Sequence, residues 1–230
     1  MVPLSPTLRA IVFDFDGLVI ETEWCEYVSI DGVFRAHGTH LDEDLWRSFI
    51  GTTDHPHWTE ILEQQLGRNL DCERLRTERV AANRPLVEAL PIKAGVEELM
   101  VEARARGVLV GIASSSPRHE WVESHLRRLD LWQFVDGSAT GDEVRRTKPD
   151  PAVYLLVLER LGVTAETAVA IEDSPAGCQA ALAAGMASVA VPSTMTAGRD
   201  FPAADVMADS VAELNVALLG DLVASRRARL

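Results

Sequence analysis

The stretch AIVFDFDG at residues 10–17 decides the fold of this 230-residue chain. Four apolar residues lead directly into acidic residues and a glycine, which is typical of a buried parallel strand that ends at a functional edge. The stretch therefore predicts the first strand of a sheet, with Asp14 and Asp16 at its carboxyl end.

Three later segments repeat this apolar pattern: VLVGIASSS at 108–116, TAVAIEDS at 167–174 and ASVAVPS at 187–193. Segments with helical spacing lie between them, including those at 93–106 and 150–162. Parallel strands need crossover helices, so this alternation predicts an α/β fold with a Rossmann-like, doubly wound parallel sheet.

Two kinds of signal mark the expected helix ends. A capping side chain followed by proline predicts helix starts at Ser116, Asp150 and Ser174. Glycines at the ends of helical segments predict left-handed caps at Gly107, Gly162 and Gly185. These signals delimit the crossover helices that we expect around the sheet.

The region between the first strand and the helix at 93–106 has a different pattern. Helical stretches follow one another there without an evident buried strand, which predicts an all-helical insert. We expect a discontinuous core of residues 1–16 and 93–230, interrupted by a helical cap domain at 17–92. Hinges are expected near 17–21 and 91–95.

Composition narrows the class of partner. A formal net charge of −13 argues against a nucleic-acid partner, because binding to a phosphate backbone needs clustered Lys and Arg. No apolar run approaches the roughly 18 residues that cross a bilayer, so we expect no membrane partner and a cytoplasmic location. A small molecule is the more plausible partner, and a monomer is the default expectation.

Acidic residues follow two of the expected strands. Asp14 and Asp16 close the first, and Glu172 and Asp173 close the segment at 167–174. The carboxyl ends of parallel strands share one edge, so these carboxylates can converge on one Mg²⁺ ion. The alternative is that each acid only caps the turn or helix that follows it.

Polar residues close to two further turns suit a phosphate group. Ser114 and the adjoining Ser115 end the strand in GIASSS, where hydroxyl and backbone N–H groups can bind a phosphoryl oxygen. Lys148, in TKPDP, can bring a positive charge to the same edge. The alternatives are a polar strand end and a solvated loop lysine.

Taken in order, DFDG at 14–17, Ser114, Lys148 and ED at 172–173 resemble the four motifs of the haloacid dehalogenase-like superfamily. The flanking strings are most similar to the branch of β-phosphoglucomutases and sugar-phosphate phosphatases. The resemblance covers nearly the whole chain, and the helical cap of that family corresponds to the insert expected here.

This resemblance implies roles for individual residues. Asp14 is expected to attack phosphorus and form an aspartyl-phosphate, while Mg²⁺ and Lys148 stabilise the transferring group. Asp16 is expected to protonate the leaving oxygen, to accept a proton from the attacking water and to bind the metal through its backbone carbonyl. Asp173 is an expected metal ligand, and Glu172 is either a further ligand or a support for one.

The resemblance also separates the activities within the family. Asp16 favours phosphoryl transfer, because dehalogenases of the family lack this second aspartate. Glu26 stands where β-phosphoglucomutases carry a histidine, which favours hydrolysis of a small phosphomonoester such as a sugar phosphate. A phosphomutase remains the alternative, and a phosphate-binding receiver without turnover is a third reading.

The cap loop GTTDHPHW at 51–58 is expected to reach over the site. Thr52 and Thr53 are the candidates there for substrate binding, and Arg118 after the second motif is another. His55 and His57 are interpreted as surface residues or substrate contacts, because their spacing is poor for a metal site.

The tryptophans fall in predicted helices or adjoining loops, and we interpret them as structural. Trp24 and Trp58 are the two candidates to line the cap cleft. Trp121, shortly after the second motif, receives no role in the chemistry from the sequence.

Overall fold

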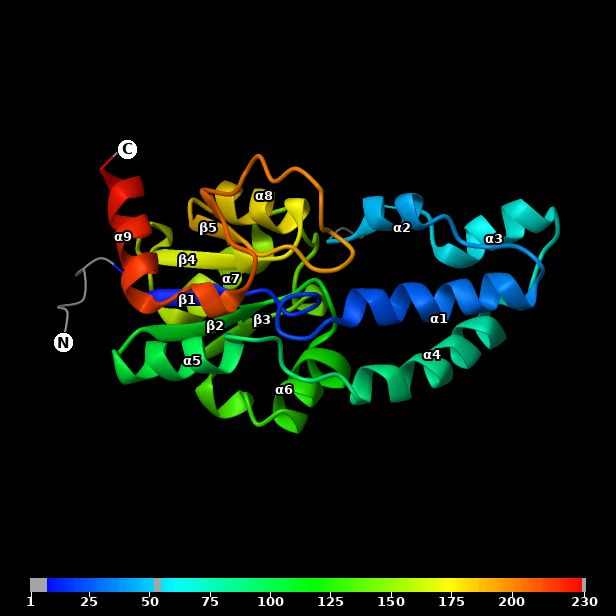
Figure 1. Ribbon diagram of the computed structural model, residues 1–230, viewed down its shortest axis with the longest axis horizontal. Coiled ribbons are helices and arrows are strands. Elements are labelled where there is room, and N and C mark those ends of the chain that lie inside the picture. Colours follow the sequence, from blue (N-terminus) through cyan, green and yellow to red (C-terminus); the bar gives the residue numbers. More distant parts are fainter. Residues whose placement is uncertain (1–7, 52–54, 229–230) are drawn as a thin grey trace.

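The computed structural model describes residues 8–51 and 55–228. It has a sheet covered by helices and, beside the sheet, a group of four helices that forms the cap (Figure 1). None of the helices in the described ranges combines the length and apolar character that a membrane span needs.

The sheet contains six parallel strands, in the order β3-β2-β1-β4-β5-β6. The strands are β1 (Ala10–Phe13), β2 (Leu109–Ala113), β3 (Gly137–Ala139), β4 (Ala168–Glu172), β5 (Ala187–Ala190) and β6 (Val206–Met207). The four strands expected from the sequence are confirmed. The two edge strands were not expected, because the short segments GSA and VM carry no long apolar run.

Helices cover both faces of this sheet (Figure 1). One layer contains α5 (Val96–Ala105), α6 (Ser124–Arg128) and α9 (Val216–Arg227), and the other contains α7 (Ala152–Leu161) and α8 (Pro175–Ala183). Side chains of β1 alternate between the layers, so Ile11 and Phe13 pack in the first core and Val12 packs in the second. The doubly wound α/β fold is confirmed.

Most of the expected helix ends are found. The hydroxyl of Ser174 accepts the N–H of Gly177 at 3.1 Å, and the carboxylate of Asp150 accepts that of Ala152 at 3.0 Å. The three glycines expected at helix ends all have positive φ angles. The expected cap at Ser116 is wrong, because its hydroxyl donates to Asp16 instead of binding the following turn of π-helix.

The cap consists of α1 (Thr22–Ala36), α2 (Glu43–Phe49), α3 (Trp58–Leu66) and α4 (Cys72–Glu88). Its helices bury an apolar core of their own, which includes Phe34 and Leu62. One member of this core comes from the other part of the chain. Met195, on the loop after β5, is fully buried against the cap.

We propose that residues 17–92 form the cap domain and that residues 1–16 and 93–230 together form the core domain. Contacts between the two connecting segments support it. The ammonium of Lys93 donates to the carbonyl of Gly17 at 2.6 Å and to the carboxylate of Glu21 at 3.0 Å. The two chain crossings between core and cap are therefore tied to each other.

Candidate active site

The candidate site lies at the carboxyl edge of the sheet, where β1 and β4 lie side by side. In this pair Phe13 is in register with Ile171, so the next residues, Asp14 and Glu172, are neighbours. The chain leaves β1 toward β2 on one side and returns to β4 on the other. Ligands of open parallel sheets bind at such a switch point.

Lys148 joins the carboxylates of both strands. Its ammonium contacts Asp14 directly, lies 2.6 Å from a carboxylate oxygen of Glu172 and donates to the carbonyl of Ala113 at 2.8 Å. The residue is buried, at 3% exposure. Burial lowers the pKa of Lys148, but the attraction of the two carboxylates outweighs this and raises it, so the side chain is a permanent cation.

The carboxylates outnumber this one cation. Burial raises the pKa of Asp14 well above its ordinary value, although the charge of Lys148 opposes the shift. Burial and the charge of Glu172 raise the pKa of Asp173 to about 8. A further positive charge at this place would stabilise all three carboxylates in their ionised form.

A divalent cation fits the three carboxylates. Asp14, Glu172 and Asp173 each place an oxygen within 4.8 Å of the others. The Oδ2 atom of Asp173 is buried and has no hydrogen-bond partner among the described residues. Oxygen ligands of this kind suit a hard cation such as Mg²⁺.

The neighbours of these carboxylates determine which of their oxygens are available to a cation. Gly17 has φ +80°, and a Cβ atom there would lie 2.2 Å from Oδ2 of Asp173, so only glycine leaves room for the carboxylate. The oxygens of Glu172 already have protein donors, since Tyr154 and Lys148 bind one and Ser174 binds the other at 3.3 Å. Asp14 and Asp173 are therefore the freer ligands.

Asp16 lies next to this cluster and accepts hydrogen bonds on both of its oxygens. One oxygen accepts from the indole of Trp121 at 2.7 Å and from Thr22 at 2.8 Å. The other accepts from Ser116 at 2.7 Å and from Ser114 at 3.3 Å. Donors from both the core and the first cap helix thus orient its carboxylate.

Sequence reasoning missed Trp121. The residue lies in the turn of π-helix at Arg118–Glu123, and its ring packs edge-on against His125 with centroids 4.9 Å apart. From the sequence, the helix start predicted after Ser116 was the only sign that Trp121 lies near the second motif. Nothing in its local pattern distinguishes an indole that donates to a carboxylate 105 positions away.

A cavity of about 290 Å³ opens above these residues, between the core and the cap. Its core side is formed by Asp14, Asp16, Ser115, Ser116, Lys148, Asp173 and Ser174. Its cap side carries both charged and aromatic residues. The volume suits a small molecule, and the two acids of the first motif and Lys148 lie at its base.

The two serines of the second motif are placed differently. Ser115 lines the cavity, and its hydroxyl is buried without a partner among the described residues. Ser114 is fully buried, donates to Asp16 and accepts the backbone N–H of Ser116 at 3.0 Å. Ser115 is therefore the serine with a free hydroxyl beside Asp14 and Lys148.

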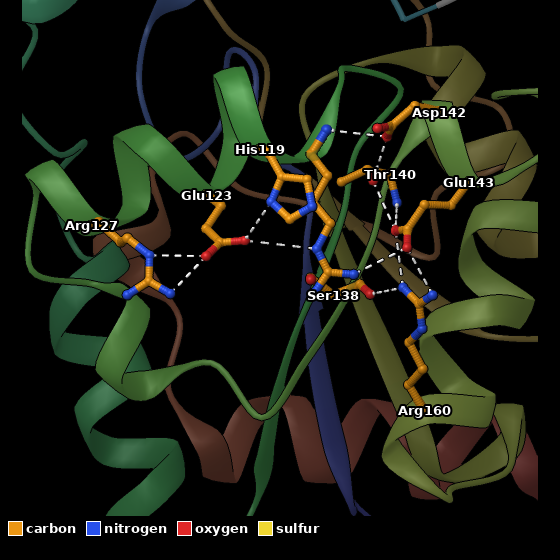
Figure 2. A network of polar contacts seen from close by, with 9 residues as sticks. His119, Glu123, Arg127, Ser138, Thr140, Asp142, Glu143 and Arg160 are labelled. Carbon is orange, nitrogen blue, oxygen red and sulfur yellow. Dashed lines mark hydrogen bonds and ion pairs between the residues drawn. The ribbon is translucent and has the colours of Figure 1, made fainter.

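Arg118 is not among the residues that line the cavity. Its guanidinium pairs with Glu143 at 3.0 Å and lies 3.8 Å from Glu123. Figure 2 shows the surrounding network, in which Arg160 donates to both carboxylate oxygens of Glu143 and Glu123 also pairs with Arg127. A substrate contact of Arg118 stays a prediction, and the structure gives its side chain a bridging role.

The cap loop supplies aromatic rings to the cavity. His55 stacks on Phe49 with ring centroids 4.4 Å apart, and His57 and Trp58 also line the wall. Trp24 does not line it and is 41% exposed. Thr52 and Thr53, the substrate contacts predicted in this loop, lie outside the described residues.

The cap also contributes an ion pair to the cavity wall. Arg79, on α4, lies 2.7 Å from the carboxylate of Glu26, on α1. Both side chains line the cavity, together with Glu23 from the first turn of α1. Burial, and then the charges of Asp173 and Asp16, raise the pKa of Glu23 well above its ordinary value.

A family model described as haloacid dehalogenase-like hydrolase matches residues 11–191. The chain belongs to this family. The match spans all four motifs and the whole cap, and it agrees with the parallel sheet and the helical cap. As a haloacid dehalogenase-like hydrolase with phosphatases among its relatives, the protein is a phosphohydrolase.

Individual relatives are similar over most of their length. Protein YhcW of Bacillus subtilis is 38% identical over 217 residues, which cover 93% of this chain and 97% of the relative. The phosphorylated carbohydrates phosphatase of Thermotoga maritima is 35% identical over 182 residues, covering 78% and 82%. The crystal structure of CbbY from Rhodobacter sphaeroides, in complex with phosphate, has a TM-score of 0.73 and 29% identity, covering 90% and 96%.

Proposed function

We propose that this protein is a Mg²⁺-dependent phosphatase that hydrolyses a small phosphomonoester, of the sugar-phosphate class, through an aspartyl-phosphate on Asp14. The observation that carries the proposal is the contact of Asp14 with Lys148 beside the unpartnered oxygen of Asp173. A carboxylate nucleophile, a fixed cation and a free metal ligand thus share one edge of one cavity.

The first half-reaction starts with Asp14. Its carboxylate attacks phosphorus, forms the acyl-phosphate bond and releases the leaving alkoxide. The ammonium of Lys148 and the hydroxyl of Ser115, which both line the cavity, stabilise the phosphoryl oxygens. Asp16, which also lines the cavity, gives a proton to the leaving oxygen.

The second half-reaction reverses the role of Asp16. Its carboxylate takes a proton from water, which attacks phosphorus and restores the carboxylate of Asp14 with release of inorganic phosphate. Asp14, Asp173 and the backbone carbonyl of Asp16 would hold a Mg²⁺ ion, which would supply positive charge near the phosphoryl oxygens. Glu172 supports the cluster through its bonds to Lys148 and Tyr154.

The sugar-phosphate class rests on the cap side of the cavity and on the relatives. Carboxylates and an arginine line it together with aromatic rings, a combination that binds hydroxyl groups and the C–H faces of a sugar. The related protein of Thermotoga maritima is named for phosphorylated carbohydrates. A receiver function without turnover would need neither Asp16 nor a cap with such a wall.

Phosphate release from a panel of small phosphomonoesters tests the proposal. We expect release that stops with a metal chelator and returns with Mg²⁺, because the carboxylates lose their counter-charge with the metal. Asp14→Asn should abolish release, whereas Asp221→Asn, on the exposed face of α9, should not. Rapid acid quenching of the native enzyme should show one phosphoryl group on Asp14 by mass spectrometry.

Three results would count against the proposal. Release that persists in Asp14→Asn would exclude this nucleophile. Release that ignores the chelator would exclude the metal. Conversion of β-glucose 1-phosphate into glucose 6-phosphate without net phosphate release would show the phosphomutase instead.

A further inference from the structure

Among the described residues, the cap side of the cavity, which faces away from Asp14, has no more cationic than carboxylate side chains. Among the described residues that line it, the cap supplies one arginine, Arg79, and the carboxylate of Glu26 already pairs with it at 2.7 Å. Glu23 adds a second carboxyl group and has no cation partner there. Formal charge on this wall is thus zero or negative, whether or not Glu23 is protonated.

The histidines do not reverse this balance. Burial, and then the nearby charge of Arg76, lower the pKa of His57, so its ring stays uncharged at neutral pH. His55 is stacked flat on Phe49, and its Nδ1 atom lies 3.0 Å from the carbonyl oxygen of Pro56. Among the described residues of this wall, a second phosphate or a carboxylate on the substrate would find no unpaired arginine or lysine.

The ion pair retains capacity for neutral hydroxyl groups. The Nε atom of Arg79 is buried and has no hydrogen-bond partner among the described residues. Arg79 donates to the Oε1 atom of Glu26, and the other carboxylate oxygen of Glu26 can accept a further hydrogen bond. An arginine donor beside a carboxylate acceptor matches two adjacent hydroxyls, one of which accepts while the other donates.

Apolar groups complete the wall. Trp46, Ile50 and Trp58 line the same cavity and are each almost fully buried. The C–H face of a sugar or polyol packs on such a surface, while its hydroxyls turn to the polar side.

We propose that the cap wall formed by Glu23, Glu26, Arg79 and the aromatic residues is a subsite for an uncharged polyhydroxyl group, so that monophosphates of sugars or polyols are substrates and bisphosphates are rejected. The inference rests on the proposed phosphatase function and specifies its substrate. It also disfavours the phosphomutase, since a mutase must hold a bisphosphate in this cavity.

The experiment compares matched pairs of substrates that differ only in a second phosphate: glucose 6-phosphate with glucose 1,6-bisphosphate, and ribose 5-phosphate with ribose 1,5-bisphosphate. We expect the native enzyme to have at least tenfold higher kcat/KM for the monophosphate of a pair. Glu26→Gln, which frees Arg79, should narrow this ratio at least threefold. Arg79→Met should raise KM for sugar monophosphates roughly ten- to hundredfold, because a charge-assisted hydrogen bond is lost.

Two controls separate a lost subsite from a damaged protein. Arg84→Gln, on the same helix but outside the cavity, should behave as the native enzyme, since its side chain is exposed and pairs with Glu88 at the surface. Calorimetry in the presence of Mg²⁺ measures how tightly Asp14→Asn binds each member of a substrate pair, and it tests the same preference without turnover.

The outcomes also separate this inference from the proposed function. Equal or tighter binding of the bisphosphates by Asp14→Asn would overturn the subsite, as would an unchanged KM in Arg79→Met. Hydrolysis of acetyl phosphate without any sugar or polyol phosphate would overturn the subsite and leave the phosphatase standing. No turnover of any phosphomonoester would overturn the phosphatase, and the binding preference of Asp14→Asn would still decide the subsite.

Discussion

The indole nitrogen of Trp121 lies 2.7 Å from Oδ1 of Asp16 and donates a hydrogen bond to it. An indole N–H can only donate, so this contact favours one orientation of the carboxylate. Thr22, the first residue of the first cap helix, binds the same oxygen at 2.8 Å. The orientation of the proposed acid–base group therefore depends on the core and the cap together.

Replacing Trp121 should slow turnover more than it weakens substrate binding. We expect Trp121→Phe to lower kcat about tenfold with a KM within twofold of native, because one of the donors that orient Asp16 is lost. Steady-state kinetics on a sugar monophosphate measures both constants.

Trp132→Phe is the matched control, since the ring of Trp132 faces the guanidinium of Arg127, 5.0 Å from its centroid, rather than Asp16. A second readout is the indole N–H resonance in a proton–nitrogen NMR spectrum, where the carboxylate contact should shift the signal of Trp121 downfield. A native kcat in Trp121→Phe would refute the positioning role.

Gly17→Ala should disable the metal site. The new Cβ would meet Oδ2 of Asp173 at 2.2 Å, so the carboxylate must move. We expect the Mg²⁺ concentration for half-maximal activity to rise at least tenfold.

Gly38→Ala controls for backbone strain, because Gly38 has the same φ of +80° but nothing within 4 Å of the added atom. This variant should lose only about 1 kcal/mol of stability and keep its Mg²⁺ requirement. Equal Mg²⁺ requirements in the two variants would mean that Asp173 is not the ligand affected.

Lys148→Met should remove activity and also change stability. The buried carboxylates of Asp14 and Glu172 lose their shared cation, and breaking a buried pair costs roughly 3–5 kcal/mol. We expect kcat to fall at least hundredfold and the free energy of unfolding without metal to decrease. Denaturant unfolding with and without Mg²⁺ separates the effects, and full activity in the variant would exclude the lysine from the chemistry.

The network around Glu143 predicts a pH-dependent stability (Figure 2). The hydrogen bond from Arg160 lowers the pKa of Glu143 from 4.5 to about 2. A lowered carboxyl pKa stabilises the fold above pH 4.5, and the contribution is lost as the pH falls from 4.5 to about 2. Glu143→Gln should therefore cost about 2 kcal/mol at pH 7.

The measurement is denaturant unfolding of both proteins at pH 7, 4 and 3. The difference between native and Glu143→Gln should shrink toward the lowest pH, because the carboxyl of the unfolded chain takes up its proton below pH 4.5 while that of the folded protein stays ionised down to about pH 2. Glu97→Gln, on the exposed face of α5, should show no such trend. A difference that stays constant with pH would contradict the ionic origin of the stabilisation.

Much of the fold and of the reactive edge could be predicted from local patterns. Short apolar runs predicted β1, β2, β4 and β5, because the strand period and the burial of a parallel sheet leave their mark on neighbouring residues. The acids at 14 and 172–173 are brought together by topology alone, since parallel strands place their carboxyl ends on one edge. The edge strands β3 and β6 lack such a pattern and escaped prediction.

By itself, the sequence determined the parallel sheet, the helical insert and the acidic edge with Lys148. Tertiary structure alone decided that Trp121 and Ser116 bind Asp16, that Glu26 meets Arg79, and that Met195 enters the core of the cap. The physical reason is the separation along the sequence over which each kind of interaction acts. Periodicity and capping act within a few residues, whereas these contacts join positions that are 53 or more apart and exist only once the chain has folded.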